Sequence, residues 1–530
     1  MKKIINRIPK TAVLYLLFSL FIIIAVSQKI NYYIDEIYSY GLSNYVGDGI
    51  DMEIEYNKTY EPGMSVFSKY MEVQEGQQFY YADVWKNQTN DVHPPLYYAI
   101  LHTVCSLFPD TFSMWYAASV NILFLLMTFY FMRKLIVLLT DKKYILTLIS
   151  LSFVTLGGII QTATYFRMYC MTMCWVTLLT WLIVCQVEEK QNWKFYVSIC
   201  MTTTLGALTH YYFIVYAFFL ACTYGIYLLH YRRYKEAFGF CVSMGAAAGI
   251  AIGIFPAMIQ HMFYGYRGTE AIANLQQRKN YWECLKTMFD EMNRQLFGNV
   301  FGYLLMVSAI VIVILFLQKN TDIFKDDGLK EILLQWDGKK KIQYTMIFVP
   351  CICYFFMVSK MSFIAADRYI WPIYAVAFSG VLCLCFSAMA QLWKNTTFIM
   401  LSAVLSAMII FGSFSSCGWT YLYKEYQTME QVVDNHKDYD CICVVEGKTY
   451  QLYPEFAEYS QYKSITFVTP EYMERNGIEQ WKDRDGLVVS MIANMEDNEA
   501  VIRQMQKKYN YTDFEYLGTF GYDNTYFLYR

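Results

Sequence analysis

The sequence has little charge for its length and no cationic excess. Charged residues make up 17% of its 530 residues, and the formal net charge is −2. Domains that bind nucleic acids carry clustered basic residues and a high isoelectric point, so no nucleic-acid partner is expected. Hydrophobic side chains make up 56% and aromatic side chains 18% of the chain, which excludes one soluble domain of ordinary composition.

The sequence also lacks the cysteine spacings of a zinc site or of a disulfide framework. Most of its 15 cysteines lie inside apolar runs, where cysteine acts as a small hydrophobic residue. Cys441 and Cys443 are two residues apart in a strand-like run, so they are poorly placed to bond each other. Internal repeats and low-complexity segments are absent as well. The cysteines therefore carry no inference about the redox compartment.

What the chain does contain is a series of long apolar runs. About 20 such residues cross the hydrocarbon core of a bilayer, and the first run, 11–27, follows four basic residues within the first ten. The eleven runs predict an all-α polytopic membrane domain over residues 1–415 with about 11 transmembrane helices. The other ten runs lie at about 112–132, 144–160, 168–186, 195–209, 211–230, 238–258, 299–318, 342–359, 369–389 and 396–415.

Lysine and arginine indicate the orientation of these spans, because cytoplasmic loops are enriched in both. The short loops that are rich in lysine and arginine all lie on the cytoplasmic side if the N-terminus is cytoplasmic and Pro95–Phe108 is a helix in the outer membrane–water interface. Segment 260–298 fits less well, because it carries five basic residues yet falls outside. We expect a multi-pass protein of the bacterial plasma membrane with an extracytoplasmic C-terminus. The alternative for the first run is a signal peptide ending near Ala25-Val26-Ser27.

Past Trp419 the composition changes to that of a soluble domain. Short buried strands are predicted at Asp440–Glu446, Ser464–Thr469 and Gly486–Ile492, and a helix is predicted at Asn498–Tyr509. The last residues, 514–530, have strong β composition. Strands that alternate with helices predict a small extracytoplasmic α/β domain over residues 416–530.

Four groups of polar residues fall on the predicted outer face. A carboxylate there can take a proton from an attacking hydroxyl, and an arginine can bind a phosphate through two parallel hydrogen bonds. Each also has an ordinary explanation: a solvated loop acid, a proline that starts a helix, or an arginine that reaches the interface. The functional interpretation rests on their convergence at one membrane face. The groups are Asp35-Glu36, Asp91 with His93-Pro94-Pro95 at the end of the loop 29–94, Arg167 with Tyr169, and His210 with Arg368-Tyr369.

Taken together, these motifs resemble those of the GT-C glycosyltransferases. The acidic pair after the first span, HPPLYY from His93 to Tyr98, R-x-Y at Arg167, H-Y-Y at His210 and RYxxP at Arg368 are similar to the branch of protein O-mannosyltransferases and of bacterial lipid A aminoarabinose and RgtA-like transferases. The resemblance covers roughly residues 10–415. A large inserted β-rich domain, as in the mannosyltransferases, is absent from the outer loops.

The resemblance implies transfer of a sugar from a polyprenyl-phosphate carrier to an extracytoplasmic acceptor, which is a glycan, a lipid or a protein. The expected catalytic residues are Asp35 as general base, Glu36 and Asp91, with inversion at the anomeric carbon. The lipid phosphate is expected to face Arg167, Tyr169, His210, Arg368 and Tyr369, and His93 of the first-loop motif is expected to bind the substrate. Mg²⁺ or Mn²⁺ could bind the oxygen ligands of the acidic pair, Asp91 and His93, but the favoured interpretation is a site without metal or other cofactor.

Three alternatives remain at the level of sequence. The first is a transporter or flippase of lipid-linked sugars, although transporters bury polar residues in mid-membrane and show repeated halves. The second is an enzyme that moves a whole oligosaccharide or a phosphoryl group. The third is an inactive relative whose outer domain binds a partner, which the intact acids and arginines disfavour.

Overall fold

The structure of the protein is a computed structural model. It describes residues 10–530 apart from 48, 278, 308, 311–337, 393–394, 446, 448, 473–480, 483 and 493–497. The described chain forms two compact units. The first, the helical unit, comprises the described residues within 1–25, 92–97 and 118–418, and the second, the sheet unit, comprises those within 26–91, 98–117 and 419–530.

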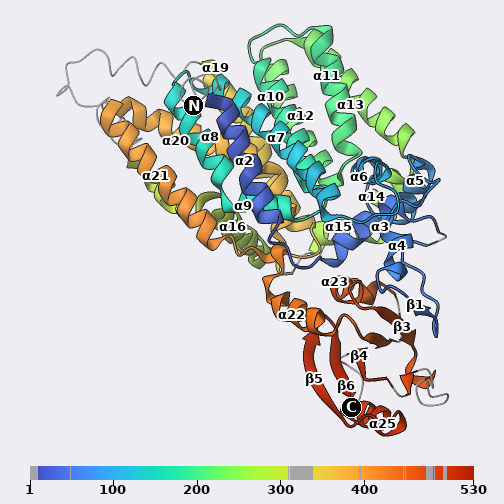
Figure 1. Ribbon diagram of the computed structural model, residues 1–530. Helices are drawn as coiled ribbons and strands as arrows, with labels where there is room; N and C mark the ends of the chain where they lie inside the picture. Colours follow the sequence, from blue (N-terminus) through green and yellow to red (C-terminus); the bar gives the residue numbers. More distant parts are fainter. Residues whose placement is uncertain are drawn as a thin grey trace, which may run out of the picture. The chain divides into compact units, whose positions relative to one another are not determined.

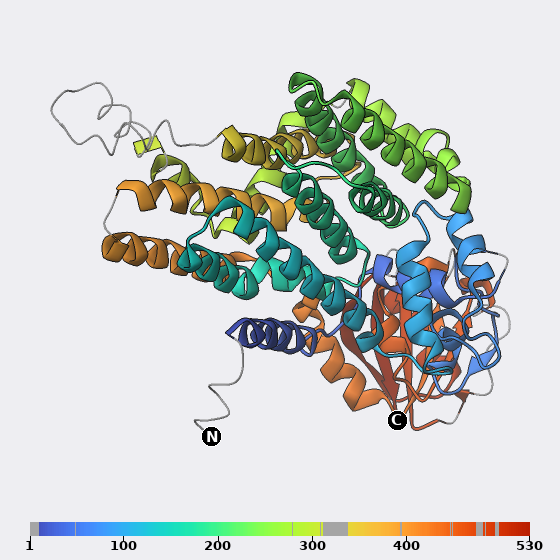
Figure 2. The ribbon, with the colours of Figure 1, turned by 90° about the horizontal axis from the view of Figure 1, so that it is seen from above.

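The helical unit consists of α-helices, most of them apolar (Figures 1 and 2). Within it α11 packs against α13, α12 against α19 and α16 against α21. Gly158 brings α9 so close to α16 that a Cβ at this position would overlap the backbone of Gln295. The helices are α2 (Lys10–Val26), α7 (Met114–Leu139), α8 (Lys143–Thr155), α9 (Gly157–Thr164), α10 (Tyr169–Cys185), α11 (Trp193–Ala207), α12 (Tyr211–His230), α13 (Tyr234–Ile254), α14 (Ala257–Phe263), α15 (Tyr266–Gln277), α16 (Tyr281–Phe297), α19 (Gly338–Met361), α20 (Tyr374–Leu392) and α21 (Asn395–Ser416).

Six described helices are long and apolar enough to cross a membrane, or seven if α8 and α9, bent by 44°, count as one span. This confirms a multi-pass architecture, and the full set of 11 spans stays a prediction. Three predicted spans correspond to helices of 15 to 17 residues, α2, α10 and α11, and 17 residues extend about 25 Å. Nine of the 20 residues of the predicted span at 299–318, namely 308 and 311–318, lie outside the described residues. The predicted interfacial segment contains α6 (Leu96–Ser106), whose 11 residues are too few to span.

A mixed sheet of six strands, in the order β1-β3-β2-β4-β6-β5, organises the sheet unit (Figure 1). Strands β3, β2 and β4 are mutually parallel, whereas β6 is antiparallel to β4 and β5 is antiparallel to β6. The strands and helix predicted past Trp419 are confirmed, although their location outside the cytoplasm stays a prediction. The elements are β1 (Thr59–Tyr60), β2 (Asp440–Val444), β3 (Ser464–Val468), β4 (Gly486–Ile492), β5 (Asp513–Phe520), β6 (Asp523–Tyr529), α22 (Gln427–His436), α23 (Phe456–Tyr459) and α25 (Asn498–Lys508).

The loop between the first apolar helix and the HPPLYY motif belongs to this same sheet unit. It contains α3 (Ile34–Asn44), α4 (Ser65–Met71) and α5 (Tyr81–Asn90). Its strand β1 pairs antiparallel with β3, with Thr59 opposite Thr466. The hydroxyl groups of these two threonines are 2.9 Å apart. The first loop and residues 419–530, which are far apart in sequence, therefore share one hydrogen-bonded sheet.

Three carboxyl groups are buried beside this sheet, those of Glu455, Glu458 and Asp523. The Tyr522 amide donates to Glu455 at 2.6 Å, and the Tyr462 hydroxyl donates to Glu458 at 3.0 Å. Burial raises the pKa of all three carboxyl groups, that of Glu458 to about 8. The folded unit therefore favours their protonated forms.

Raised folded-state pKa values predict that the sheet unit loses stability as the pH rises. The contribution of the buried protonated carboxyl groups to the stability of the sheet unit is present below the ordinary carboxyl pKa, about 4.3. It is lost as the pH approaches about 8, because the buried groups must then ionise. Hydrogen exchange in peptides covering β4 and β6, corrected for the intrinsic rate at each pH, should show weaker protection at pH 8.5 than at pH 6.

The variant Glu458→Gln should reduce this difference, because its amide cannot ionise. Glu515→Gln is the matched control, since Glu515 is exposed on β5. An unchanged pH dependence in Glu458→Gln would show that this carboxyl group is not its source.

Candidate functional site

The predicted acidic pair lies in the first turn of α3, in the sheet unit. Asp35 is half-buried, whereas Glu36 is fully buried and its Oε2 lies 3.0 Å from Nζ of Lys29. The same Oε2 accepts the backbone N–H of Tyr33 at 2.7 Å, so Glu36 caps the helix that carries it. Glu36 thus has a structural task, and its predicted catalytic role stays a prediction.

Asp91, the third predicted acid, ends α5 in the same unit as Asp35. Its N–H donates to Asn87 O at 3.0 Å, and α5 packs against α3. Tyr38 lies one turn after Asp35 on α3. Burial and a hydrogen bond to Asp51 raise the pKa of the Tyr38 hydroxyl, and the charge of Asp91 raises it further. The helices that carry Asp35 and Asp91 are thus packed together.

His93 opens the part of the HPPLYY motif that belongs to the helical unit. Its Nε2 lies 3.3 Å from a guanidinium nitrogen of Arg167. A guanidinium can only donate, so Nε2 accepts and the His93 hydrogen is placed on Nδ1. Arg167 itself is only 4% exposed, in the turn between α9 and α10. Asn121 on α7 holds this turn by donating to the carbonyls of Ala163 and Tyr165.

His210 caps the N-terminus of α12 and lies beside the same residues. Its Nδ1 accepts the N–H of Tyr212 at 3.0 Å, and its ring centroid is 6.2 Å from that of His93 and 5.3 Å from that of Tyr169. Burial, reinforced by the neighbouring His93 and by the positive charge of Arg167, holds the pKa of His210 well below its ordinary range. The ring is therefore neutral and carries its hydrogen on Nε2.

Arg368 and Tyr369 form a short 3₁₀ turn, η1 (Asp367–Tyr369), that reaches this group of rings. The guanidinium carbon of Arg368 is 5.8 Å from the ring centroid of Tyr165 and 5.3 Å from that of Tyr369, within cation–π range. The Tyr369 ring packs edge-on against that of Tyr212. We define the arginine–aromatic cluster as His93, Tyr165, Arg167, Tyr169, His210, Tyr212, Arg368, Tyr369 and Trp371.

Gln295 on α16 connects this cluster to the helices behind it. Its fully buried amide donates to Asp367 Oδ2 at 2.7 Å and accepts from Trp371 Nε1 at 3.0 Å and from the Tyr374 hydroxyl at 3.1 Å. Oδ1 of Asp367 in turn accepts the N–H of Arg368 at 2.8 Å. Gln295 therefore fixes the turn that presents Arg368.

All six predicted substrate-binding residues thus lie in one cluster of the helical unit, whereas Asp35, Glu36 and Asp91 belong to the sheet unit. The sequence analysis missed Gln295, which belongs to no motif. It also missed Lys29, although a lysine just past an apolar run and seven residues before Glu36 could have been recognised as a partner for that carboxylate. Among the residues that the structure describes, no three of histidine, cysteine, aspartate and glutamate are placed to hold a metal ion.

Comparison with known proteins gives a fold. No family model matches the sequence, and no curated protein is similar to it. The crystal structure of ArnT from Cupriavidus metallidurans bound to undecaprenyl phosphate matches 98% of this chain and 97% of its own, with a TM-score of 0.50 and 9% identity. The chain therefore has the fold of ArnT, which agrees with the resemblance of its motifs to the aminoarabinose transferase branch.

Two further solved structures match with lower scores. ArnT from the same organism in the apo state has a TM-score of 0.43 at 10% identity, over 96% of this chain and 97% of that one. The archaeal oligosaccharyltransferase AglB from Archaeoglobus fulgidus, in complex with an inhibitory peptide and a dolichol-phosphate, has 0.42 at 9% identity, over 95% and 69%. Scores below 0.5 do not establish a shared fold.

The bonds of Gln295 predict that Gln295→Met destabilises the helical unit. Methionine has a similar volume but leaves Asp367, Trp371 and Tyr374 each without one partner, at about 1–3 kcal/mol per buried group. Thermal unfolding of the detergent-solubilised protein should begin about 5 °C lower or more. Gln277→Met, at an exposed position of α15, is the matched control and should change little.

A swap of donor and acceptor separates the loss of this hydrogen bond from general disruption. Gln295→Glu alone places two carboxyl groups together, whereas adding Asp367→Asn restores a donor opposite an acceptor at unchanged net charge. The double variant should recover part of the thermal stability. Equal instability of the single and double variants would contradict the assigned role of this pair.

Proposed function

We propose that the protein is a membrane glycosyltransferase that moves a sugar from a polyprenyl-phosphate carrier to an acceptor outside the cytoplasm. The observation that carries the proposal is the arginine–aromatic cluster. Two largely buried arginines, Arg167 and Arg368, meet a neutral His210 among tyrosine and tryptophan rings. Their guanidinium groups suit a phosphate, and the rings suit the faces of a sugar or the first isoprene units of a lipid. The fold shared with ArnT agrees with this ligand.

The acids on the sheet unit supply the second requirement, a base. Asp35 is half-buried in the first turn of α3, on a helix packed against the one that Asp91 ends. Chain connectivity links this side to the cluster: Asp91 and His93 are separated by one residue, so their Cα atoms cannot be more than about 7 Å apart. Asp91 of the predicted acids and His93 of the arginine–aromatic cluster therefore belong to one short segment of the chain.

The reaction that we propose is a direct displacement. The carboxylate of Asp35 takes the proton of the acceptor nucleophile as that atom bonds to the anomeric carbon. The bond from this carbon to the phosphate oxygen breaks, and the polyprenyl phosphate leaves with the electron pair. Arg167 and Arg368 stabilise the charge that develops on the phosphate. A single displacement inverts the anomeric configuration.

We further propose that the reaction needs no metal and takes place at the outer face of a bacterial plasma membrane. Two arginines can meet the charge of a phosphate monoester, and Glu36, one of the oxygen ligands first considered for Mg²⁺ or Mn²⁺, is paired with Lys29. Membrane lipid surrounds the helical unit in this proposal, and the acceptor is a glycan, a lipid or a protein of the cell envelope.

The variant Asp35→Asn tests the base. Its amide cannot accept a proton, so transfer of labelled sugar from polyprenyl-phosphate donors by membranes carrying the variant should fall by about 100-fold or more. Asp438→Asn, an exposed residue of the same unit, is the matched control. A chelator should leave the wild-type rate unchanged. Near-normal transfer by Asp35→Asn would show that another group is the base.

The variant Arg368→Lys tests phosphate recognition. Lysine keeps the charge but loses the two parallel hydrogen bonds, so the KM for the donor should rise and kcat should fall, whereas the KM for the acceptor should hardly change. Arg232→Lys, exposed in the loop between α12 and α13, is the control. If the wild-type protein flips lipid-linked sugars in vesicles but transfers none, the protein is a flippase and the proposed transferase activity is wrong.

A further inference from the structure

The residues that precede α3 are bonded, one after another, to the segment 419–454. Nζ of Lys29 donates to Tyr421 O at 2.6 Å, and the backbone N–H of Ile30 donates to Leu422 O at 3.0 Å. Nδ2 of Asn31 then donates to Pro454 O at 2.9 Å. The approach to the acid-bearing helix is thus held to a part of the chain about 400 residues away in sequence.

Lys29 is the centre of this attachment. Its side chain is 1% exposed, and its ammonium group contacts the Glu36 carboxylate at 3.0 Å as well as the Tyr421 carbonyl. It also lies 4.9 Å from the ring centroid of Tyr423 and 5.6 Å from that of Tyr32. Burial lowers the pKa of Lys29, and the attraction of Glu36 opposes this shift.

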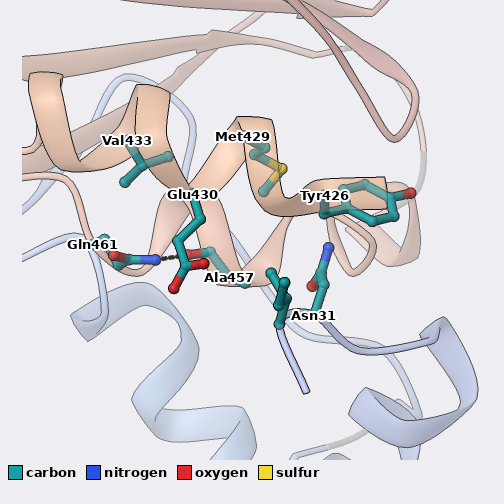
Figure 3. A pocket seen from close by; sticks show the side chains of 8 residues that line it. Asn31, Tyr426, Met429, Glu430, Val433, Ala457 and Gln461 are labelled. Carbon is teal, nitrogen blue, oxygen red and sulfur yellow. Dashed lines mark hydrogen bonds between the residues drawn. The ribbon is translucent and has the colours of Figure 1, made fainter. Parts of the chain in front are cut away.

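Apolar and ring contacts extend the attachment along both sides of α3. Ile30 and Asn31 line a small pocket together with Tyr426, Met429 and Val433 of the C-terminal segment (Figure 3). The figure shows Asn31 directed toward Tyr426. Further along, the Tyr38 ring packs edge-on against the Tyr453 ring at 5.1 Å, and the Tyr453 hydroxyl accepts the N–H of Met52 at 2.8 Å.

We propose that residues 419–454 are a positioning element for Asp35, and that Lys29 is the positioning residue through which they act. Glu36 transmits this constraint, because the oxygen that pairs with Lys29 also accepts the N–H of Tyr33 and so fixes the first turn of α3. The inference rests on the proposed function for the role of Asp35, and it gives the C-terminal segment a task in the same reaction.

The test replaces the ion pair by a neutral pair of similar volume, Lys29→Met with Glu36→Gln, in the full chain. Neither charge is then left buried alone. We expect kcat to fall at least ten-fold with the KM for the donor unchanged, because the arginine–aromatic cluster is intact. The control Lys424→Met removes an exposed contact of the same two segments, to Gln28, and should keep the wild-type kcat.

Hydrogen exchange in α3 gives a reading that does not depend on transfer. Peptides covering Ile34–Asn44 should exchange faster in the double variant, while peptides from α12 keep the wild-type rate. Wild-type exchange in α3, or an unchanged kcat, would overturn the proposal. A parallel rise of the donor KM and of exchange throughout the protein would also overturn it, because it would indicate general disruption.

A second variant, Asn31→Leu, covers the case in which the double variant does not fold. It removes the hydrogen bond that Asn31 donates to Pro454 O and the one that it accepts from the Tyr32 N–H, and it should give a smaller change of the same kind. If α3 exchanges faster in either variant although the wild-type protein transfers no sugar, the attachment stands and the proposed function fails. If the wild-type protein transfers sugar but both variants behave like it, the positioning role fails and the proposed function stands.

Discussion

The acid-bearing part of this protein depends on one buried ion pair, that of Lys29 and Glu36. Removing two charges from water costs several kcal/mol per ion, so such a pair is stable only if further hydrogen bonds satisfy both partners. Here the Tyr421 carbonyl and two ring faces surround the ammonium group, and the Tyr33 amide completes the carboxylate. Because the same oxygen pairs with the lysine and caps α3, the start of that helix depends on the far end of the chain.

In the helical unit, neutral groups rather than an ion pair hold the residues around the two buried arginines. Gln295 donates to Asp367 and accepts from Trp371 and Tyr374 without adding a charge. His210 is held neutral by burial beside Arg167, so the cluster does not accumulate a third cation beside its two arginines. A neutral imidazole and ring faces therefore lie against Arg167 and Arg368.

Local patterns in the sequence predicted the secondary structure, because helices and strands depend mainly on neighbouring residues. Apolar runs predicted the helices, and alternating strand and helix signals predicted the strands past Trp419. The predicted topology placed His93, Arg167, His210 and Arg368 at one membrane face, because each follows or precedes a span on that face. The count of spans was less certain, since helices of 15 to 17 residues lie at the margin of bilayer length.

Long-range contacts left no comparable signal. Strand β1 has two residues and exists through its partner Ser464–Val468, and nothing around Gln295 distinguishes it from a surface glutamine of an amphipathic helix. The HPPLYY motif shows what a short pattern does encode. Pro94 and Pro95 fix two backbone angles, and the N–H of Leu96 donates to Leu208 O in the turn that carries His210. The motif therefore anchors His93 beside His210 and, through one intervening residue, fixes how far Asp91 can lie from the cluster.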